Sequence, residues 1–465
     1  MTTRRQFLTQ TTLGGTAAVF LPLGCTPNQD AKGGSPNIST SMPKIKSVIR
    51  REETLLRLGG NGDNFHMSWA ADDKQYVSLC DGSGFSDTFK ANYNTRMFTV
   101  EGSPDEAKFS DVPDYPTLAF PQQGGNDPRY YGFGTLALDG HIYQYLSTFN
   151  KKLSVSELAT AKHIPDSELM RFNGVKLIYS PDNGRTWLNQ NGSGPVSWEG
   201  WDNRSLDTMV FLDEDQDAFS LLTVLQMGRN YEHNKDGFIY VYAPNGNTDG
   251  TMNELVMFRV PKTKLLDRSS YEFFAGLTST GPSWSHDIFA RKPVHTFPRG
   301  WVNRLYHPYS WHPSVVYNAP LGVYMMANWG FCSDDANVPM TGIPMKDIWF
   351  SKPSYLGLWI SRNPWGPWTQ IHEETSWMPG GDANARAYQP QVAPKWISED
   401  GKSLWLVWTD FQMTDREVIA QATQAASASG AGDWSMAHEA MKDQLMRKYM
   451  PYYSFNTQRI DLEVA

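Results

Sequence analysis

The chain has 465 residues, of which 40% are hydrophobic and 13% aromatic, and its formal net charge is −8. This acidic balance argues against nucleic acid or anionic lipid as a partner, because both attract basic proteins. The three cysteines lack metal-type spacing, and no phosphate-binding loop or zinc-binding helix motif occurs, so we expect no metal or other cofactor.

The first 24 residues predict an export signal. Arg4 and Arg5, within Thr-Arg-Arg-Gln-Phe-Leu, precede a weakly apolar stretch that is too short to span a bilayer. Leu-Pro-Leu-Gly-Cys then resembles a lipoprotein cleavage box that ends at Cys25, although Pro22 stands where leucine is usual. Two alternatives stay open: Cys25 carries a lipid, or the chain is simply cleaved nearby. A lipid at Cys25 would be the one attachment to a membrane that we expect. We expect export by the twin-arginine route to the periplasm, the cell envelope or the medium.

The rest of the chain divides into a tether and a folded body. Residues 25–48 are rich in Gly, Pro, Ser, Asn and Lys, which is typical of a flexible linker. Residues 49–465 can form one large β domain or two smaller ones. Without residues 1–24 the chain loses two arginines and no acid, so 39 basic residues face 49 acidic ones, a net charge of −10. For Cys80 and Cys332 we expect two free thiols, with a disulfide as the alternative.

Residues 59–82 predict a β-hairpin that presents two carboxyl groups. The strands are 65–70 and 75–80, rich in aromatic and β-branched residues, and an Asp-Asp turn joins them. A hairpin brings its two outer ends to one edge of a sheet, so Asp63 and Asp81 should lie close together. They could form an acid/base pair, or both could be polar caps at strand ends.

The hairpin pattern recurs along the chain. A short strand, a turn with Asp or Asn and Gly, and a second aromatic-rich strand return in four places: 133–147, 221–242, 314–326 and 391–408. Five hairpins at spacings of roughly 70–90 residues suit propeller blades with long insertions. The sequence therefore predicts an all-β fold, a five-bladed β-propeller with long inter-blade insertions and a short C-terminal helix.

The C-terminal part predicts how the ring closes. Residues 452–464 alternate in polarity and could complete a blade with the N-terminal segment. Residues 430–448 predict a helix with Asp433 as a cap. An apolar stripe should face the core, formed by Met436, Ala440, Met441 and Leu445.

The most specific short motif is Ser180-Pro-Asp-Asn-Gly-Arg-Thr-Trp187. It matches the Asp box of sialidase-like propellers, which has a structural role. Asp182 and Gly184 should shape a tight turn, and Trp187 should pack between strands of one blade.

Several stretches together resemble a family of five-bladed propellers secreted by bacteria. They include Gly-Asp-Asn at 62–64, Cys-Asp-Gly at 80–82, and the later segments 227–244, 258–276 and 312–318. The family was long a domain of unknown function, looks related to furanosidase-type glycoside hydrolases, and includes endo-D-arabinanases. The resemblance covers roughly residues 55–460 and implies a glycosidase site in the central funnel, with Asp63 and Asp81 as its carboxylates.

Strand direction sorts the other candidate residues by sheet edge. The turn acids should lie at the edge opposite to Asp63, namely Asp72, Asp139, Asp236 and Asp400. Substrate-binding candidates fall at the same edge as Asp63: Asn64, Asp127, Tyr131, Trp311, His312, Arg386, Tyr388 and Asp410. For each of these alone, an ordinary loop or cap role is the alternative.

Two histidines raise the question of a metal. His307 and His312 could bind an ion on the propeller axis, whereas His66, inside a strand, fits a hydrogen-bonded core histidine. We expect no metal.

Two functions fit the sequence. The first is a glycoside hydrolase that acts on an extracellular polysaccharide, such as a furanose polymer like D-arabinan, with Asp63 and Asp81 as acid/base or nucleophile. The second is a non-catalytic carbohydrate-binding propeller tethered to the cell envelope. The aromatic residues favour sugar binding in both.

Overall fold

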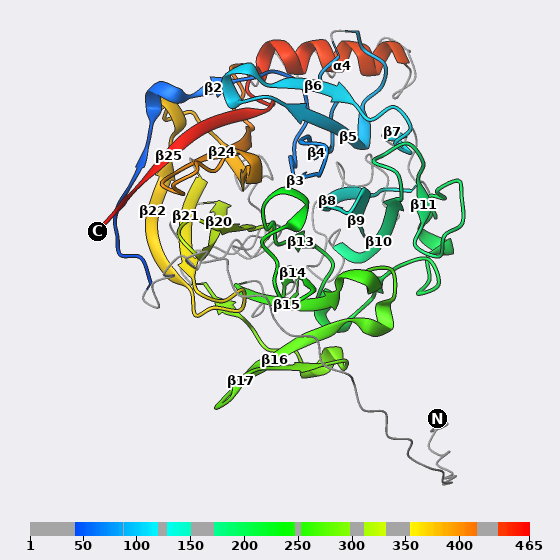
Figure 1. The fold of residues 1–465 in the computed structure, drawn as a ribbon. Helices are drawn as coiled ribbons and strands as arrows, with labels where there is room; N and C mark the ends of the chain where they lie inside the picture. Colours follow the sequence, from blue (N-terminus) through cyan, green and yellow to red (C-terminus); the bar gives the residue numbers. More distant parts are fainter. Residues whose placement is uncertain are drawn as a thin grey trace, which may run out of the picture. The chain divides into compact units, whose positions relative to one another are not determined.

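Five antiparallel sheets stand around a common axis, as Figure 1 shows. This computed structural model describes residues 42–86, 88–119, 128–149, 172–246, 253–297, 311–331, 354–415 and 436–465. Each sheet is one blade, and its strands follow one another from the axis outward. The predicted five-bladed propeller is confirmed.

Blades one and two follow the first two predicted hairpins. Blade one contains β3 (Met67–Trp69), β4 (Gln75–Leu79), β5 (Tyr93–Glu101) and β6 (Lys108–Asp111), with β7 (Leu118–Ala119) beside β5. Blade two contains β8 (Tyr131–Leu138), β9 (His141–Phe149), β10 (Phe172–Ser180) and β11 (Leu188–Asn189), with β12 (Phe211–Leu212) beside β10.

Blades three and four follow the next two hairpins. Blade three contains β13 (Thr223–Val224), β14 (Phe238–Pro244), β15 (Glu254–Pro261), β16 (Glu272–Thr278) and β17 (Gly281–Ser285), with β18 (His295–Thr296) beside β15. Blade four contains β19 (Ser314–Asn318), β20 (Val323–Phe331), β21 (Ser354–Ser361) and β22 (Thr369–Trp377).

Blade five closes the ring with both ends of the body. It contains β23 (Ala387–Val392), β24 (Ser403–Asp410), β25 (Asn456–Val464) and β1 (Ile45–Arg50), with β2 (Leu56–Arg57) beside β25. β1 runs antiparallel to β25, from Ile45 opposite Val464 to Arg50 opposite Ile460. The predicted pairing of the N-terminal and closing segments is therefore confirmed.

Short 3-10 helices occur at strand ends and in connections. They are η1 (Glu52–Thr54), η2 (Pro104–Glu106), η4 (Trp201–Asn203), η5 (Asp215–Asp217), η6 (Arg229–Tyr231), η7 (Lys262–Lys264), η8 (Arg268–Ser270), η9 (Ile288–Ala290), η11 (Pro379–Gly381) and η12 (Pro394–Trp396).

The hydrophobic core lies mainly between neighbouring blades. One cluster joins blades one and two, a larger one centres on blade three, another joins blades four and five, and a fourth joins blades five and one. The Asp box forms its tight turn, since Ser180 Oγ accepts a bond from the Gly184 amide at 2.7 Å and Asp182 accepts one from the Thr186 amide at 2.8 Å. Trp187, however, packs against Tyr115 of blade one as well as its own blade, so it joins two blades rather than strands of one.

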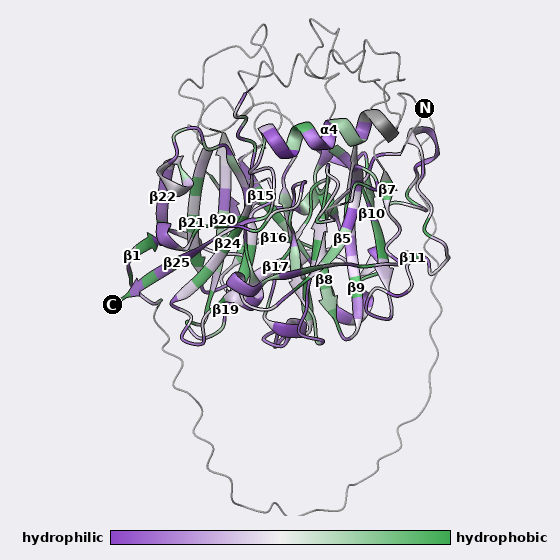
Figure 2. Ribbon diagram, turned by 90° about the horizontal axis from the view of Figure 1, so that it is seen from above, coloured by the Kyte–Doolittle hydropathy of each residue, from purple (hydrophilic) through white to green (hydrophobic). Residues whose placement is uncertain are grey.

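The C-terminal helix α4 (Met436–Tyr449) lies across one face of the propeller (Figure 2). The prediction that an apolar stripe of this helix faces the core is wrong. Ala440, Met441 and Leu445 are only half-buried, whereas the acidic side chains of Glu439 and Asp443 are buried. Polar residues of blade one pair with those acids, and this explains the reversal. The expected cap, Asp433, lies outside the described residues. Among the described residues, no helix is long and apolar enough to cross a membrane.

Candidate active site

Asp63 and Asp81 lie together at one edge of blade one. The amide of Asp63 donates to the carbonyl of Cys80, and the amide of Cys80 donates back to Asp63, both at 2.9 Å. This pair of bonds extends the β3–β4 hairpin by one bridge and leaves Asp81 directly beyond it. The predicted placement of Asp63 and Asp81 close together at one edge of the hairpin is confirmed.

The backbone at this edge departs from regular strand geometry. In a regular ladder, side chains alternate between faces, so Asp81 would point away from the face that Asp63 and Cys80 share. Asp81 instead has a φ of 51° and Asn64 a φ of 60°, the left-handed region that most residues avoid. The turn at Asp81 breaks the alternation, and its carboxyl group experiences the charge of Asp63. The next residue, Gly82, must be a glycine, because a Cβ at this position would overlap the carbonyl of Asn61.

Three donors hold the carboxyl group of Asp63. Tyr388 Oη donates to Oδ2 at 2.7 Å, Asn64 Nδ2 donates to Oδ1 at 2.6 Å, and the hydroxyl of Tyr453 is a third donor. Asp63 is only 9% exposed. Burial raises the pKa of Asp63 to about 6, and the three hydrogen bonds limit the rise because they stabilise the anion.

Asp81 has a different environment. Asn94 Nδ2 lies 3.5 Å from its Oδ1, a weak contact, and the cations of Arg129 and Lys442 act on it from a greater distance. Burial and the negative charge of Asp63 raise the pKa of Asp81 well above its ordinary value. Each carboxyl group therefore opposes ionisation of the other, and Asp63, with more hydrogen-bond donors, is the better stabilised as an anion. Two buried carboxyl groups in unequal environments at a shared edge are suited to acid/base chemistry.

Tyr453, which sequence reasoning missed, belongs to the centre of this site. Its single hydroxyl proton is shared between two acceptors, the carboxyl group of Asp63 and the backbone carbonyl of Asp81 at 3.1 Å. A signal was available: β25 runs antiparallel to β24, so the residues before β25 must lie at the edge where β24 ends, beside Asp410. The edge rule that selected Tyr388 would also have selected Tyr453.

Helix α4 brings a lysine to the same edge. Ser83 Oγ donates to Asp443 at 2.5 Å, Asn92 Nδ2 donates to Glu439 at 2.5 Å, and Arg447 donates to Ser83 at 2.8 Å. Lys442 lies one turn from Glu439 and therefore on the helix face that meets blade one. The edge rule that selected Asp127 and Tyr131 also covers Arg129, which lies between them in the sequence. Nothing in the sequence pointed to Lys442, because its position depends on how α4 docks.

An aromatic cluster forms the wall beside the carboxyl groups. Buried Tyr131, Trp311, Tyr388 and Tyr453 pack together with Cys80, and partly exposed Phe172, Trp201 and Phe411 pack against them. Tyr131 lies near enough to Asp81 for the charge of that carboxyl group to raise its pKa. The predicted candidates Tyr131, Trp311 and Tyr388 are thus brought together with the catalytic candidates.

Two predicted substrate-binding residues are placed differently. His312 is fully buried, with its ring 3.9 Å from that of Phe133 and 5.1 Å from that of His66, so it supports the wall from behind. Asp410 is also fully buried, and its Oδ1 accepts bonds from the amides of Arg386 at 2.8 Å and Gln412 at 3.0 Å. Both are corrections, because residues with no exposed surface cannot line a binding site.

Other predictions resolve as follows. Arg386 lies half-buried, and its guanidinium donates to the carbonyls of Ala383 and Ala385. The turn acids lie at the opposite edge, as Asp236 shows by accepting a bond from Tyr240 at 2.5 Å in the β13–β14 connection. Asp127, His307, Cys332 and Cys25 lie outside the described residues.

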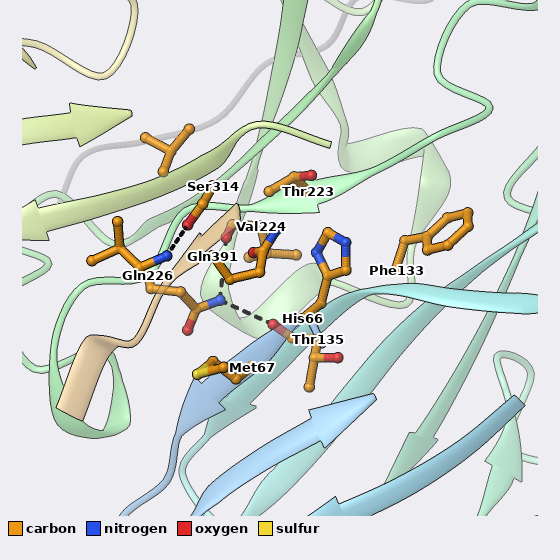
Figure 3. Close-up of a pocket in the computed structure, with 11 residues that line it drawn as sticks. His66, Met67, Phe133, Thr135, Thr223, Val224, Gln226, Ser314 and Gln391 are labelled. Carbon is orange, nitrogen blue, oxygen red and sulfur yellow. Dashed lines mark hydrogen bonds between the residues drawn. The ribbon is translucent and has the colours of Figure 1, made fainter. Parts of the chain in front are cut away.

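The propeller axis holds a small polar cavity, shown in Figure 3. All five blades line it, through His66, Thr135, Thr223, Gln226, Ser314 and Gln391 among others. It offers about 10 Å³ to the centre of a water molecule, enough for one water and too little for a sugar. His66 is buried there, and burial lowers its pKa to about 3. It is a core histidine as expected, but its Nε2 has no hydrogen-bond partner, so the expected hydrogen bonding at that atom is wrong. Within the described ranges, no three His, Cys, Asp or Glu side chains gather to hold a metal ion.

Comparison with known proteins gives likeness at the level of fold. No family model and no curated protein matches the chain. Among solved structures, an alpha-L-arabinofuranosidase from Lactobacillus brevis is 12% identical with a TM-score of 0.42, covering 89% of this chain and 94% of its own. A candidate hydrolase from Bacteroides ovatus ATCC 8483 is 11% identical with a TM-score of 0.44, covering 87% of each chain. The alpha-L-arabinofuranosidase PaAbf62A from Podospora anserina is 8% identical with a TM-score of 0.39, covering 88% and 96%. At such values these likenesses say nothing about substrate or mechanism.

Proposed function

We propose that this protein is a glycoside hydrolase that cleaves an extracellular polysaccharide, with Asp63 and Asp81 as its catalytic pair. One observation carries the proposal: two adjacent carboxyl groups at one edge of a propeller lie in different hydrogen-bonding environments, and burial raises the pKa of both. Glycosidases need one protonated and one ionised carboxyl group at the same time. The first candidate substrate is a furanose polymer such as D-arabinan, on the family resemblance of the sequence.

The environments of the two groups suggest their roles. Asp81, whose pKa is raised by burial and by the charge of Asp63, gives its proton to the glycosidic oxygen as the bond to the anomeric carbon breaks. Asp63 either attacks that carbon, forming an ester that water then hydrolyses, or takes a proton from the water that attacks it. The first course retains the anomeric configuration and suits carboxyl groups about 5 Å apart, whereas the second inverts it and suits about 6.5–9.5 Å. Tyr388, Asn64 and Tyr453 keep Asp63 ionised and fixed in orientation.

Isosteric substitution of each carboxyl group tests the proposal. Asp63→Asn and Asp81→Asn should each release reducing ends from a panel of D-arabinan, L-arabinan and arabinoxylan at least about a hundredfold more slowly than wild type. Asp400→Asn, at a turn on the opposite edge, is the matched control and should keep full activity. Full hydrolysis by both folded site variants would exclude the pair from the chemistry. NMR of the first product anomer would decide between retention and inversion.

A second candidate is a non-catalytic carbohydrate-binding propeller. What favours it is that Asp63 is only 9% exposed and already accepts three hydrogen bonds, which leaves little of the carboxyl group for a substrate. Both functions include sugar binding, so product analysis separates them. Retention of the protein by a polysaccharide without any new reducing ends would favour the binding protein.

We also propose export by the twin-arginine route, on the strength of the N-terminal motif alone. Replacing Arg4 and Arg5 together by Lys should leave the precursor in the cytoplasm, as fractionation and immunoblotting would show. Normal export of the double variant would remove this assignment. Labelling with radioactive palmitate, with Cys25→Ser as control, would decide whether Cys25 carries lipid.

A further inference from the structure

The aromatic wall beside the carboxyl groups continues outward along blade two. The ring of Phe172, at the start of β10, lies 5.8 Å from that of Tyr131 in an edge-to-face arrangement. The next residue, Asn173, accepts a hydrogen bond from Arg204 at 3.4 Å, and the guanidinium of Arg204 lies 4.7 Å from the ring centre of Trp201. Phe172 and Trp201 both pack against the buried cluster that contains Tyr131, so the wall extends from the carboxyl groups to Trp201.

The loop that carries Trp201 is held in place by buried polar contacts. Lys176 Nζ lies 3.0 Å from the carboxylate of Glu199, and these side chains are only 2% and 9% exposed. Tyr130 Oη donates to the backbone carbonyl of Glu199 at 2.9 Å. Because Tyr130 directly precedes Tyr131, one strand start fixes both the inner wall and the outer loop. A buried ion pair adds little stability by itself, but it fixes the conformation of the segment that it anchors.

This fixed loop presents apolar surface to solvent. Trp201 and Phe172 are partly exposed, and Leu206 on the same loop is 67% exposed. Arg204 covers part of the indole and also donates to Thr148 Oγ1 at 3.1 Å, so the ring is locked before any ligand arrives. A rigid, partly exposed aromatic ring binds with little loss of conformational entropy.

We propose that Trp201 and Phe172 form an outer carbohydrate subsite, in which the rings stack on the C–H faces of neutral sugar units removed from the bond that is cleaved. The ligand class is a neutral polysaccharide chain, whose alternating C–H faces and hydroxyl groups match an aromatic surface flanked by Arg204 and Asn173. This inference rests on the proposed function for the position of the cleaved bond, and extends it to the length of chain that the protein binds.

The test compares matched tryptophans. Trp201→Ala removes the subsite ring, whereas Trp284→Ala removes a partly exposed ring that also stacks on an arginine, Arg259, but lies on the outer hairpin of blade three. Affinity electrophoresis in gels that contain D-arabinan, L-arabinan or arabinoxylan measures binding without requiring catalysis. We expect Trp201→Ala to weaken binding about tenfold, the value of one good aromatic contact. Trp284→Ala should bind as wild type does.

Further variants guard against a folding artefact. Trp201→Phe should recover most of the affinity, and Phe172→Ala should weaken it in the same direction as Trp201→Ala. If the wild type cleaves one of the polymers, Trp201→Ala should raise KM on the polymer far more than on the shortest fragment that is cleaved.

The outcomes separate the subsite from the hydrolase. Weaker binding by Trp201→Ala with no new reducing ends from wild type would support the subsite and overturn the hydrolase. Wild-type binding and cleavage by Trp201→Ala would overturn the subsite and leave the hydrolase standing. Failure of wild type to bind any of the three polymers would overturn the subsite.

Discussion

Removing the hydroxyl of Tyr388 should shift the acid side of the pH–activity profile. This hydroxyl donates to Asp63 at 2.7 Å, in a buried site. A hydrogen bond to a charged group contributes about 1.5–3 kcal/mol, and one pKa unit corresponds to about 1.4 kcal/mol. Since the bond stabilises the anion, Tyr388→Phe should raise the pKa of Asp63 from about 6 by roughly 1–2 units.

The assay is the pH dependence of kcat/KM for release of reducing ends. The acid limb, set by ionisation of Asp63, should move upward by those 1–2 units. Near pH 6.5 the variant should then be roughly 3-fold to 25-fold less active than wild type. Tyr240→Phe is the matched control, because Tyr240 donates a comparable bond to Asp236 at the opposite edge. An unchanged acid limb in Tyr388→Phe, together with inactivity of Asp63→Asn, would refute the reasoning that this bond sets the ionisation of Asp63.

Three further predictions concern stability, the second limb and the thiols. The folded-state pKa of Asp63 is raised from 3.8 to about 6, so ionising it destabilises the folded state by up to about 3 kcal/mol above pH 6 and not at all below about pH 4. Asp63→Asn should therefore melt at higher temperature than wild type at pH 7.5 but not at pH 4, and equal melting at both would contradict this. Lys442 lowers the pKa of Asp81, so Lys442→Met should move the alkaline limb to higher pH, and a limb that stays in place would show that α4 has no electrostatic effect there. Cys80 is buried and free, so we expect it to react with a thiol reagent only after denaturation. Counting thiols in the denatured protein should find both Cys80 and Cys332 free; a mass two protons light with no titratable thiol would contradict this.

The fold was largely readable from the sequence because its signals are local. The turn of the second hairpin, Asp139-Gly140, has the positive φ values that its residue types favour, and the strands on either side carry the aromatic and β-branched residues typical of a sheet. Ring closure was also predictable, because the alternating segment 456–464 needs partners on both sides. Which face of α4 is buried was not predictable from the sequence. Glu439 and Asp443 are buried because they form hydrogen bonds with residues more than 340 positions away in the chain.

The sequence predicts which residues lie at the edge that forms the site, but not the direction in which their side chains point. The hairpin rule places Asp63 and Asp81 at one edge, because it depends only on strand direction. The same rule cannot tell which way a side chain points. His312 has a φ of 48°, which breaks the strand alternation, and its ring lies in the core. Asp410 likewise points inward, to cap two backbone amides that no sequence pattern reveals.

The ring closure described above also fixes when the site can exist. Asp63 follows the first strand of the body, yet two of its donors, Tyr388 and Tyr453, belong to the last blade and the segment that enters β25. During synthesis the carboxyl group is therefore made long before the hydroxyl groups that hold it. Contacts across so much of the chain form late in folding. A ribosome-bound chain, or one truncated before residue 453, lacks an assembled site, so the arrangement of the carboxyl pair belongs to the finished molecule alone.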